Sequence, residues 1–170
     1  MSEPSAPIVV TALFGPGDDR WIQEMRRANY PPERNRVPAH LTLFHQLPPS
    51  AESELSRRIA RHAAAPPPRA RILGAMDLGA GTALRVESEE LEDIRMDLAE
   101  GLHGLLSVQD RAPWRPHITV QNKVEPKEAR ALQQRLRAIL EPRPLHIRGL
   151  AAWRYLGGPW EKLRDWPFRG

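Results

Sequence analysis

A short pattern that occurs twice constrains this chain more than any other feature. "HLTL" occupies residues 40–43 and "HITV" occupies residues 117–120, and each lies in an apolar run that follows a proline. With six His and four Thr in 170 residues, a His two positions before a Thr is expected only about 0.14 times by chance. The two copies of this HxTx motif therefore indicate two related structural units.

The segments around the motifs repeat the same order of elements. Apolar and β-branched runs that end at Gly or Pro predict strands, and apolar residues at helical spacing predict helices. The first half contains a strand at 8–14, a helix from Asp18, the HLTL strand, a helix within 49–64 and a strand at 70–78. The second half contains a strand at 82–87, a helix at 89–106, the HITV strand, a helix from Pro126 and two final strands around "GGP". This order predicts a tandem pair of similar lobes.

Composition narrows the class of protein. A chain of this length is expected to form one compact domain, here residues 1–170. The absence of cysteine excludes disulfides, thiolate catalysis and cysteine-ligated metal sites, and it favours a reducing cytoplasm. The N-terminal "MSEPSAPIVVTALFG" is too short and polar for an export signal, and no later run approaches a membrane span. We therefore expect a soluble, unprocessed, cytoplasmic protein with no membrane contact.

The net charge of +4 favours anionic partners only weakly, because most arginines are dispersed among acidic residues. The sequence has no dense basic tract and no recognised RNA-binding motif, so extended contact with nucleic acid is not supported. A short or terminal substrate fits this composition better.

Strand geometry predicts what the motif spacing does, because residues two apart point to the same face. One polar face then carries His40, Thr42, Phe44 and Gln46, and the other carries His117, Thr119, Gln121 and Lys123. The apolar residues between them point to the core. If a pseudo-twofold axis relates the lobes, the two polar faces meet across a cleft with two imidazoles and two hydroxyls.

Such a cleft suits phosphodiester chemistry without a metal. A neutral imidazole can take a proton from the attacking oxygen while a protonated one gives a proton to the leaving oxygen. Threonine hydroxyls can donate to phosphate oxygens, and Lys123 or an arginine could balance developing negative charge. Two other interpretations remain: each motif could be an ordinary strand segment, or the histidines could bind a metal, although the absence of a carboxylate on either face leaves that ligand set short.

The paired "HLTL" and "HITV" resemble the signature of the 2H phosphoesterase superfamily, which includes bacterial 2′-5′ RNA ligase-like proteins and 2′,3′-cyclic nucleotide phosphodiesterases. The resemblance implies a bilobal, pseudo-twofold α+β fold, in which two antiparallel sheets form a V-shaped central cleft with helices outside. The lobes would span about 1–78 and 79–170, with strands free to exchange between them. It also implies that His40 and His117 act as general acid and base, that Thr42 and Thr119 bind phosphate, and that no metal or cofactor is required.

The chain departs from the family pattern after each motif. Many RNA ligase-like members have an arginine after the second motif, where this chain has "QNKV". The first motif continues as "FHQLP", which adds His45. Parity places His45 opposite His40, so we interpret it as a structural or rim residue.

The sequence thus predicts a phosphoesterase that opens 2′,3′-cyclic phosphates or acts on 2′-5′ bonds at RNA ends or in nucleotides, and that works as a monomer. An RNA-end or nucleotide-binding module with little turnover is the alternative, and an interaction protein using the strand "PWEKLRDWPF" is a weaker third. Besides the four motif residues, the candidate substrate contacts are Phe44, Gln46, Gln121, Lys123, Arg115, Arg36, Trp114 and Tyr30.

Overall fold

The computed structural model describes residues 6–169, and its elements follow the predicted order. The strands are β1 (Ile8–Phe14), β2 (Leu41–Leu47), β3 (Arg69–Asp77), β4 (Thr82–Glu87), β5 (His117–Gln121), β6 (Arg143–Arg154) and β7 (Glu161–Pro167). The helices are α1 (Pro16–Asn29), α2 (Glu52–Ala63), α3 (Glu89–Gly101), α4 (Val108–Arg111) and α5 (Pro126–Ile139), with short 3-10 turns at Pro32–Arg34 and Pro49–Ala51. Residues 1–5, part of the stretch for which we expected no export signal, lie outside the described residues.

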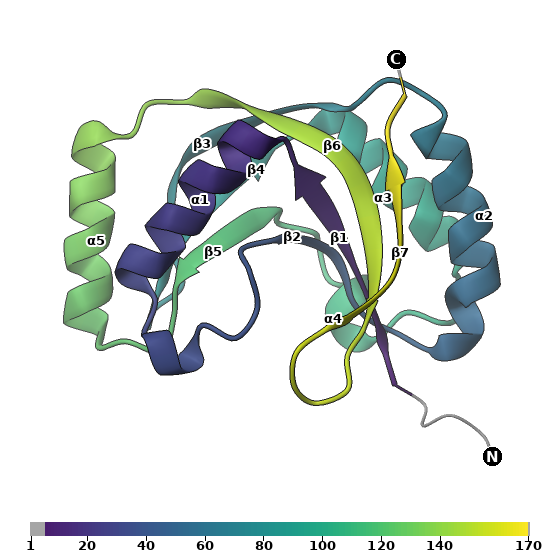
Figure 1. Cartoon of the computed structure of the whole chain (residues 1–170), viewed down its shortest axis with the longest axis horizontal. Helices are drawn as coiled ribbons and strands as arrows, with labels where there is room; N and C mark the ends of the chain where they lie inside the picture. Colours follow the sequence, from purple (N-terminus) through teal and green to yellow (C-terminus); the bar gives the residue numbers. More distant parts are fainter. Residues whose placement is uncertain (1–5, 170) are drawn as a thin grey trace.

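The predicted α+β class is confirmed, but the strands do not form two separate sheets. Across residues 6–169, seven strands make one antiparallel sheet in the order β1-β2-β5-β4-β3-β6-β7, and β6 also pairs with β1. The sheet closes because β6 is long enough to pair with β3 through its first residues and with β1 through the rest. The expected arrangement of two sheets is therefore replaced by a barrel-like sheet with helices on its outside (Figure 1).

The strand order is symmetric about the β2–β5 pair. β1 pairs with β2 as β4 pairs with β5, and the two HxTx strands meet at Leu41 and Ile118. The third strand of each half pairs with the first strand of the other half, β3 with β4 and β6 with β1. This connectivity places the two motifs on adjacent strands of the sheet.

The helices cover the sheet with the apolar faces that their sequence periodicity predicts. In α2, Leu55, Ile59 and Ala63 form one buried stripe. The side-chain oxygen of Ser88 caps α3 by accepting a hydrogen bond from the backbone N–H of Leu91. The helix predicted for 89–106 is shorter, since α3 ends at Gly101 and the chain then turns through Gly104, whose φ is 87°.

Each HxTx strand contains a register shift directly after its threonine. On β2, Thr42 lies opposite Thr11 but Phe44 lies opposite Val10, so one residue is unmatched. On β5, Thr119 lies opposite Ala83 but Gln121 lies opposite Thr82, which is the same shift at the equivalent position. A β-bulge of this kind inserts one residue and changes the face of every residue that follows.

The bulges contradict the strict alternation that the sequence analysis assumed. Phe44 has no exposed surface, and Gln121 is 3% exposed. The Oε1 atom of Gln121 accepts a hydrogen bond of 2.9 Å from the hydroxyl of Thr82 within the core. The prediction that Phe44 and Gln121 share the polar faces is therefore wrong, because both follow a bulge and point inward.

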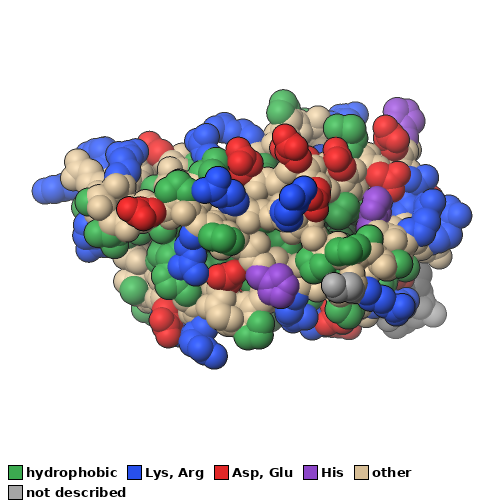
Figure 2. Space-filling view, turned by 90° about the horizontal axis from the view of Figure 1, so that it is seen from above, with side chains coloured by type: hydrophobic (Ala, Val, Ile, Leu, Met, Phe, Trp, Pro, Cys, Tyr) green, Lys and Arg blue, Asp and Glu red, His purple; other side chains and the backbone are tan. Residues whose placement is uncertain are grey.

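Charge on the outer surface is mixed. On the face shown in Figure 2, basic side chains lie among acidic ones and form several separate clusters. None of the described helices combines the length and the apolarity needed to cross a membrane.

The close approach of β4 and β5 predicts that Gly81 cannot be replaced by a larger residue without loss of stability. A Cβ atom there would lie 2.1 Å from the carbonyl oxygen of Gln121, a backbone atom that cannot move aside. Gly81→Ala should lower the free energy of unfolding by about 1–3 kcal/mol in urea denaturation, because the strands must separate. Gly17→Ala, in the first turn of α1, is the control, since apart from its chain neighbours and the backbone of its own helix no atom lies within 4 Å of the added Cβ. Equal stability of the Gly81→Ala variant and the parent would contradict this register.

Candidate active site

The four motif side chains lie in one cavity. It has a volume of about 370 Å³, and its wall contains Thr42 of β2, His40 directly before β2, and His117 and Thr119 of β5. The remaining lining residues are His45, Arg95, Gln109, Ala112, Pro113, Trp114 and Arg115. The cavity therefore joins residues that lie 77 positions apart in the chain.

The backbone holds both motif imidazoles in the same way. Nδ1 of His40 lies 2.9 Å from the carbonyl oxygen of Pro38, and Nδ1 of His117 lies 2.7 Å from that of Arg115. A carbonyl oxygen can only accept, so we assign the proton of each neutral ring to Nδ1. The Nε2 lone pair of each ring is then left for proton transfer.

The surroundings of His40 keep its ring neutral. Burial lowers the pKa of His40 to about 4, and the bond to Pro38 opposes this change. The charges of Arg26, His45 and His117 lower the pKa further. At neutral pH, the ring of His40 is consequently uncharged.

Two arginines cross between the halves and fix the motif strands. Nη1 of Arg26, on α1, donates to the carbonyl oxygen of Thr119 on β5 at 2.8 Å. Nε of Arg95, on α3, donates to the carbonyl oxygen of Leu43 on β2 at 2.7 Å. Burial lowers the pKa of both guanidinium groups, but from so high a value that they stay charged. Neither arginine is identifiable from the sequence, because helical periodicity does not reveal a partner in the other half.

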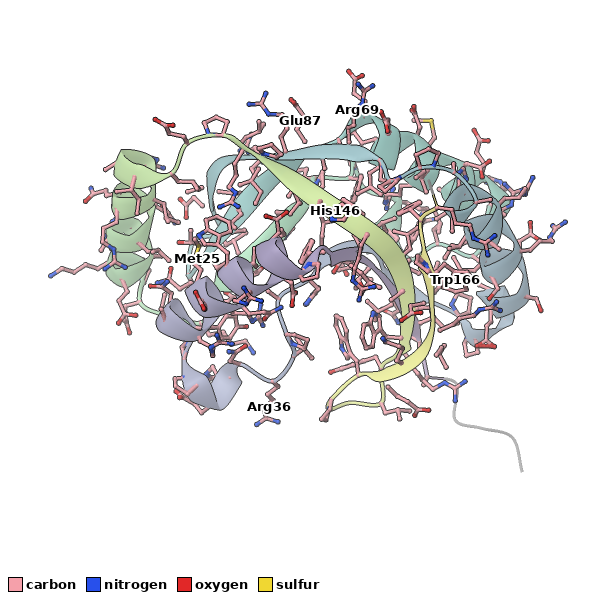
Figure 3. All side chains as sticks on the ribbon, turned by 45° about the horizontal axis from the view of Figure 1, so that its top comes forward. Met25, Arg36, Arg69, Glu87, His146 and Trp166 are labelled. Carbon is pink, nitrogen blue, oxygen red and sulfur yellow. The ribbon has the colours of Figure 1, made fainter. Side chains whose placement is uncertain are left out.

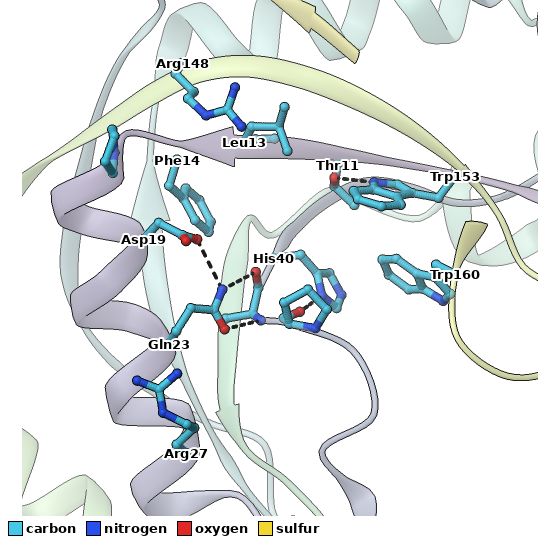
Figure 4. Close-up of a pocket in the computed structure, with 14 residues that line it drawn as sticks. Thr11, Leu13, Phe14, Asp19, Gln23, Arg27, His40, Arg148, Trp153 and Trp160 are labelled. Carbon is cyan, nitrogen blue, oxygen red and sulfur yellow. Dashed lines mark hydrogen bonds between the residues drawn. The ribbon is translucent and has the colours of Figure 1, made fainter. Parts of the chain in front are cut away.

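A second cavity adjoins the first through His40. It has a volume of about 590 Å³ and is bounded by Trp153 and Trp160 on one side and by α1 on the other (Figure 4). The ring centroids of His40 and Trp160 lie 4.6 Å apart with a tilt of 57°, and those of Trp153 and Trp160 lie 6.1 Å apart. Nε1 of Trp153 donates to the hydroxyl of Thr11 at 2.9 Å. The sequence placed these tryptophans on terminal strands but gave no reason to bring them to His40.

Two of the other sequence-predicted contacts lie at the first cavity. Trp114 and Arg115 line it, and Nε1 of Trp114 donates to the carbonyl oxygen of Thr42 at 3.0 Å. The Arg115 carbonyl holds His117, as described above. These two residues are therefore part of the cavity wall as well as of the loop before β5.

The remaining sequence-predicted contacts do not line either cavity. Arg36 projects outward from the loop before β2 (Figure 3). The guanidinium carbon of Arg26 lies 4.2 Å from the centroid of the Tyr30 ring, so this ring packs against an arginine of α1. Gln46 follows the bulge in β2 and is exposed. Lys123 lies in the turn after β5 with a φ of 59°, so strand parity does not apply to it.

A buried carboxylate stabilises the irregular end of β2. Asp110, on α4, has a fully buried side chain and accepts the backbone N–H of His45 at 2.8 Å and that of Gln46 at 3.0 Å. A further register shift lies here, between the Val10 and Ile8 pairings of β1. Asp110 thus provides acceptors where the regular ladder is interrupted.

Across residues 6–169, no three His, Cys, Asp or Glu side chains are grouped so as to hold a metal ion.

This carboxylate makes stability depend on pH. Burial opposes ionisation, but the hydrogen bonds from the ring and backbone of His45 and from the backbone of Gln46 hold the pKa of Asp110 below its ordinary value. The folded state therefore binds protons less readily at this group than the unfolded chain does. The contribution of the ionised Asp110 to the free energy of unfolding is complete above the unfolded pKa of about 3.9. This contribution is lost as the pH falls through the lower pKa of the folded state.

Asp110→Asn should consequently lower the free energy of unfolding by about 1–3 kcal/mol at pH 7, because a buried charged acceptor is lost. The difference from the parent should shrink below about pH 4, where the protonated carboxyl resembles the amide. Urea denaturation at pH 7, 5 and 3 measures this, with the exposed Asp165→Asn as control. A difference that stays constant over this range would contradict the assigned role.

Comparisons with known proteins agree with the fold. The family model described as the 2′-5′ RNA ligase superfamily matches residues 14–159. TT0787 of Thermus thermophilus is 17% identical with a TM-score of 0.63, and the match covers 96% of this chain and 98% of that one. E. coli LigT, solved with NADP+, is 16% identical with a TM-score of 0.62 over 97% and 99% of the chains. The LigT structure with 3′-AMP has the same identity and a TM-score of 0.60 over 98% and 100%. No curated protein matches the sequence.

Proposed function

The chain belongs to the 2′-5′ RNA ligase superfamily, and on that premise we propose that it is a metal-independent phosphoesterase. Membership supports an activity on phosphodiester bonds in general. We propose more narrowly that the enzyme acts on 2′,3′-cyclic phosphates or 2′-5′ bonds of RNA ends or nucleotides. The observation that carries this proposal is the placement of two equivalently held imidazoles, His40 and His117, in one cavity with Thr42 and Thr119.

In the hydrolytic direction, Nε2 of His40 takes a proton from water as the water oxygen attacks phosphorus. His117, protonated at Nε2, gives its proton to the ribose oxygen as the bond between that oxygen and phosphorus breaks. His40 is assigned as the base because its lowered pKa keeps it neutral at the start of the reaction. When a 5′-hydroxyl attacks in place of water, the same two groups keep these roles and the product is a 2′-5′ bond. They exchange roles when that bond is cleaved back to the cyclic phosphate.

The threonines and Arg95 stabilise the negative charge of the phosphate, and Arg26 positions the backbone of Thr119. The hydroxyls of Thr42 and Thr119 donate to the non-bridging phosphate oxygens, whose negative charge is greatest in the transition state. Arg95 lines the same cavity and adds a fixed positive charge. Arg26 acts through the backbone of Thr119, which it holds in place.

The nucleoside part of the substrate fits the second cavity. Trp160 presents an aromatic face next to His40, and stacking on such a face tolerates any base. The structural relative LigT has been solved with 3′-AMP and with NADP+, which supports a ligand that carries a base and a phosphate. We therefore propose a nucleotide or RNA terminus whose phosphate lies between the threonines and whose base lies against Trp160.

Replacing either histidine tests the chemistry. His40→Ala and His117→Ala should each lower turnover by about 10² or more, measured with EDTA present on a panel of 2′,3′-cyclic nucleotides and cyclic-phosphate-ended oligonucleotides. His103→Ala, at an exposed position on the link after α3, is the matched control. Turnover that survives both substitutions, or that EDTA abolishes, would reject the two-imidazole mechanism. A parent protein that binds the panel without turnover would instead support the binding-module alternative.

Replacing Trp160 tests the placement of the base. Trp160→Ala should lower kcat/KM for cyclic nucleotides about tenfold through KM, because base stacking contributes about 1–3 kcal/mol. Tyr155→Ala is the control, since Tyr155 lies in the same β6–β7 connection but is exposed and lines neither cavity. Equal KM values for Trp160→Ala and the parent would place the base elsewhere.

A further inference from the structure

His45 lies in the catalytic cavity, contrary to the interpretation from strand parity. It lines the same space as His40 and His117, and its side chain is 38% exposed. Strict alternation placed it on the opposite face from His40. The bulge after Thr42 reverses that parity, so the wall of the cavity contains a third imidazole.

The ring of His45 is held by a buried acid. Its Nδ1 lies 3.1 Å from Oδ1 of Asp110, whose side chain is fully buried. Asp110 also holds the backbone of His45 through both carboxylate oxygens, at 2.8 Å and 3.1 Å. Since Nδ1 donates to Asp110, Nε2 is the ring nitrogen that can contact a ligand in the cavity.

The charges around the ring favour an anion. The groups that face it from the packed elements are Asp110 of α4, Arg95 of α3, His40 directly before β2, Arg115 in the loop before β5, and His117 at the start of β5. The described residues that line the cavity include no Asp or Glu. Asp110 therefore lies behind the ring, and negative charge in front of it has to come from a ligand.

We propose that His45 is a third substrate-binding imidazole, which carries a proton when an oxyanion occupies the cavity and donates from Nε2–H to a phosphate oxygen. The ring then lies between two negative groups, Asp110 and the ligand, and both stabilise its charged form. The identity of the oxyanion as a substrate phosphate rests on the proposed function. Binding of an oxyanion, however, requires no turnover.

Sulfate is the probe, because it is tetrahedral like phosphate but does not titrate between pH 6 and 8. In titration calorimetry at pH 6, His45→Gln should weaken sulfate binding about tenfold, since a charge-assisted hydrogen bond is lost. The glutamine amide can still donate to Asp110, so the fold should be retained. At pH 8 the two proteins should differ by less than about twofold, because an unprotonated His45 has no Nε2–H to donate.

His62→Gln is the matched control. His62 pairs with Asp97 through an Nε2–Oδ2 distance of 2.7 Å, so it is also a histidine–carboxylate pair, but it lies between α2 and α3 and lines neither cavity. Its sulfate affinity should equal that of the parent at both pH values. A second measurement uses the parent itself: adding sulfate near pH 7 should move the ring ¹⁵N resonances of His45 toward the imidazolium values.

The outcomes separate this inference from the proposed function. Equal sulfate affinity of the parent and His45→Gln at pH 6, or ring resonances of His45 that sulfate does not move, would overturn the inference even if the parent turns over cyclic phosphates. A loss of sulfate affinity in His45→Gln would support it even if the parent turned over nothing in the substrate panel.

Discussion

The cavity that holds both motif histidines depends on the pairing of β2 with β5. The two strands are joined at Leu41 and Ile118, both without exposed surface. Because each of these residues follows a motif histidine directly, burying them positions the two imidazoles beside the same cavity. The contact between the strands is short, so other interactions must fix their relative position. The backbone bonds from Arg26 and Arg95 do this, each from a helix of one half to the motif strand of the other.

The two bulges show that the pseudo-symmetry extends to backbone detail. Both motif strands gain one residue directly after the threonine, and both then turn the fourth residue after the histidine into the core. In the first strand this residue is Phe44, which packs under the guanidinium of Arg95. In the second it is Gln121, which needs a polar partner and has Thr82. The halves therefore share geometry while filling equivalent positions with different chemistry.

Sequence reasoning predicted the order of elements, the α+β class and the residues that meet at the centre. These depend on periodicity and on a repeated motif, which are local and can be read directly. It failed where a single inserted residue changed the face of the strand, as for Phe44 and His45, because a bulge has no local signature here. It also missed Arg95, Asp110 and Trp160, whose roles arise from partners far away in the chain. Asp110 could have been suspected only as an acidic residue in the loop before a motif strand.

The causes of the lowered pKa of His40 also bear on whether its ring stays uncharged, as its proposed role as a base requires, once an anionic substrate is bound. An anionic substrate offsets the repulsion that His40 experiences from Arg26, His45 and His117, and this change alone would raise the pKa. Burial, however, is the largest cause of the lowered pKa, and a ligand that displaces water from the cavity removes still more solvent from the ring. The two motif histidines share their backbone geometry, but Trp160 packs against the ring of His40, which alone of the two also lines the second cavity. The two motif imidazoles thus have unequal surroundings within a symmetric frame, and the proposed division into proton acceptor and donor rests on this difference.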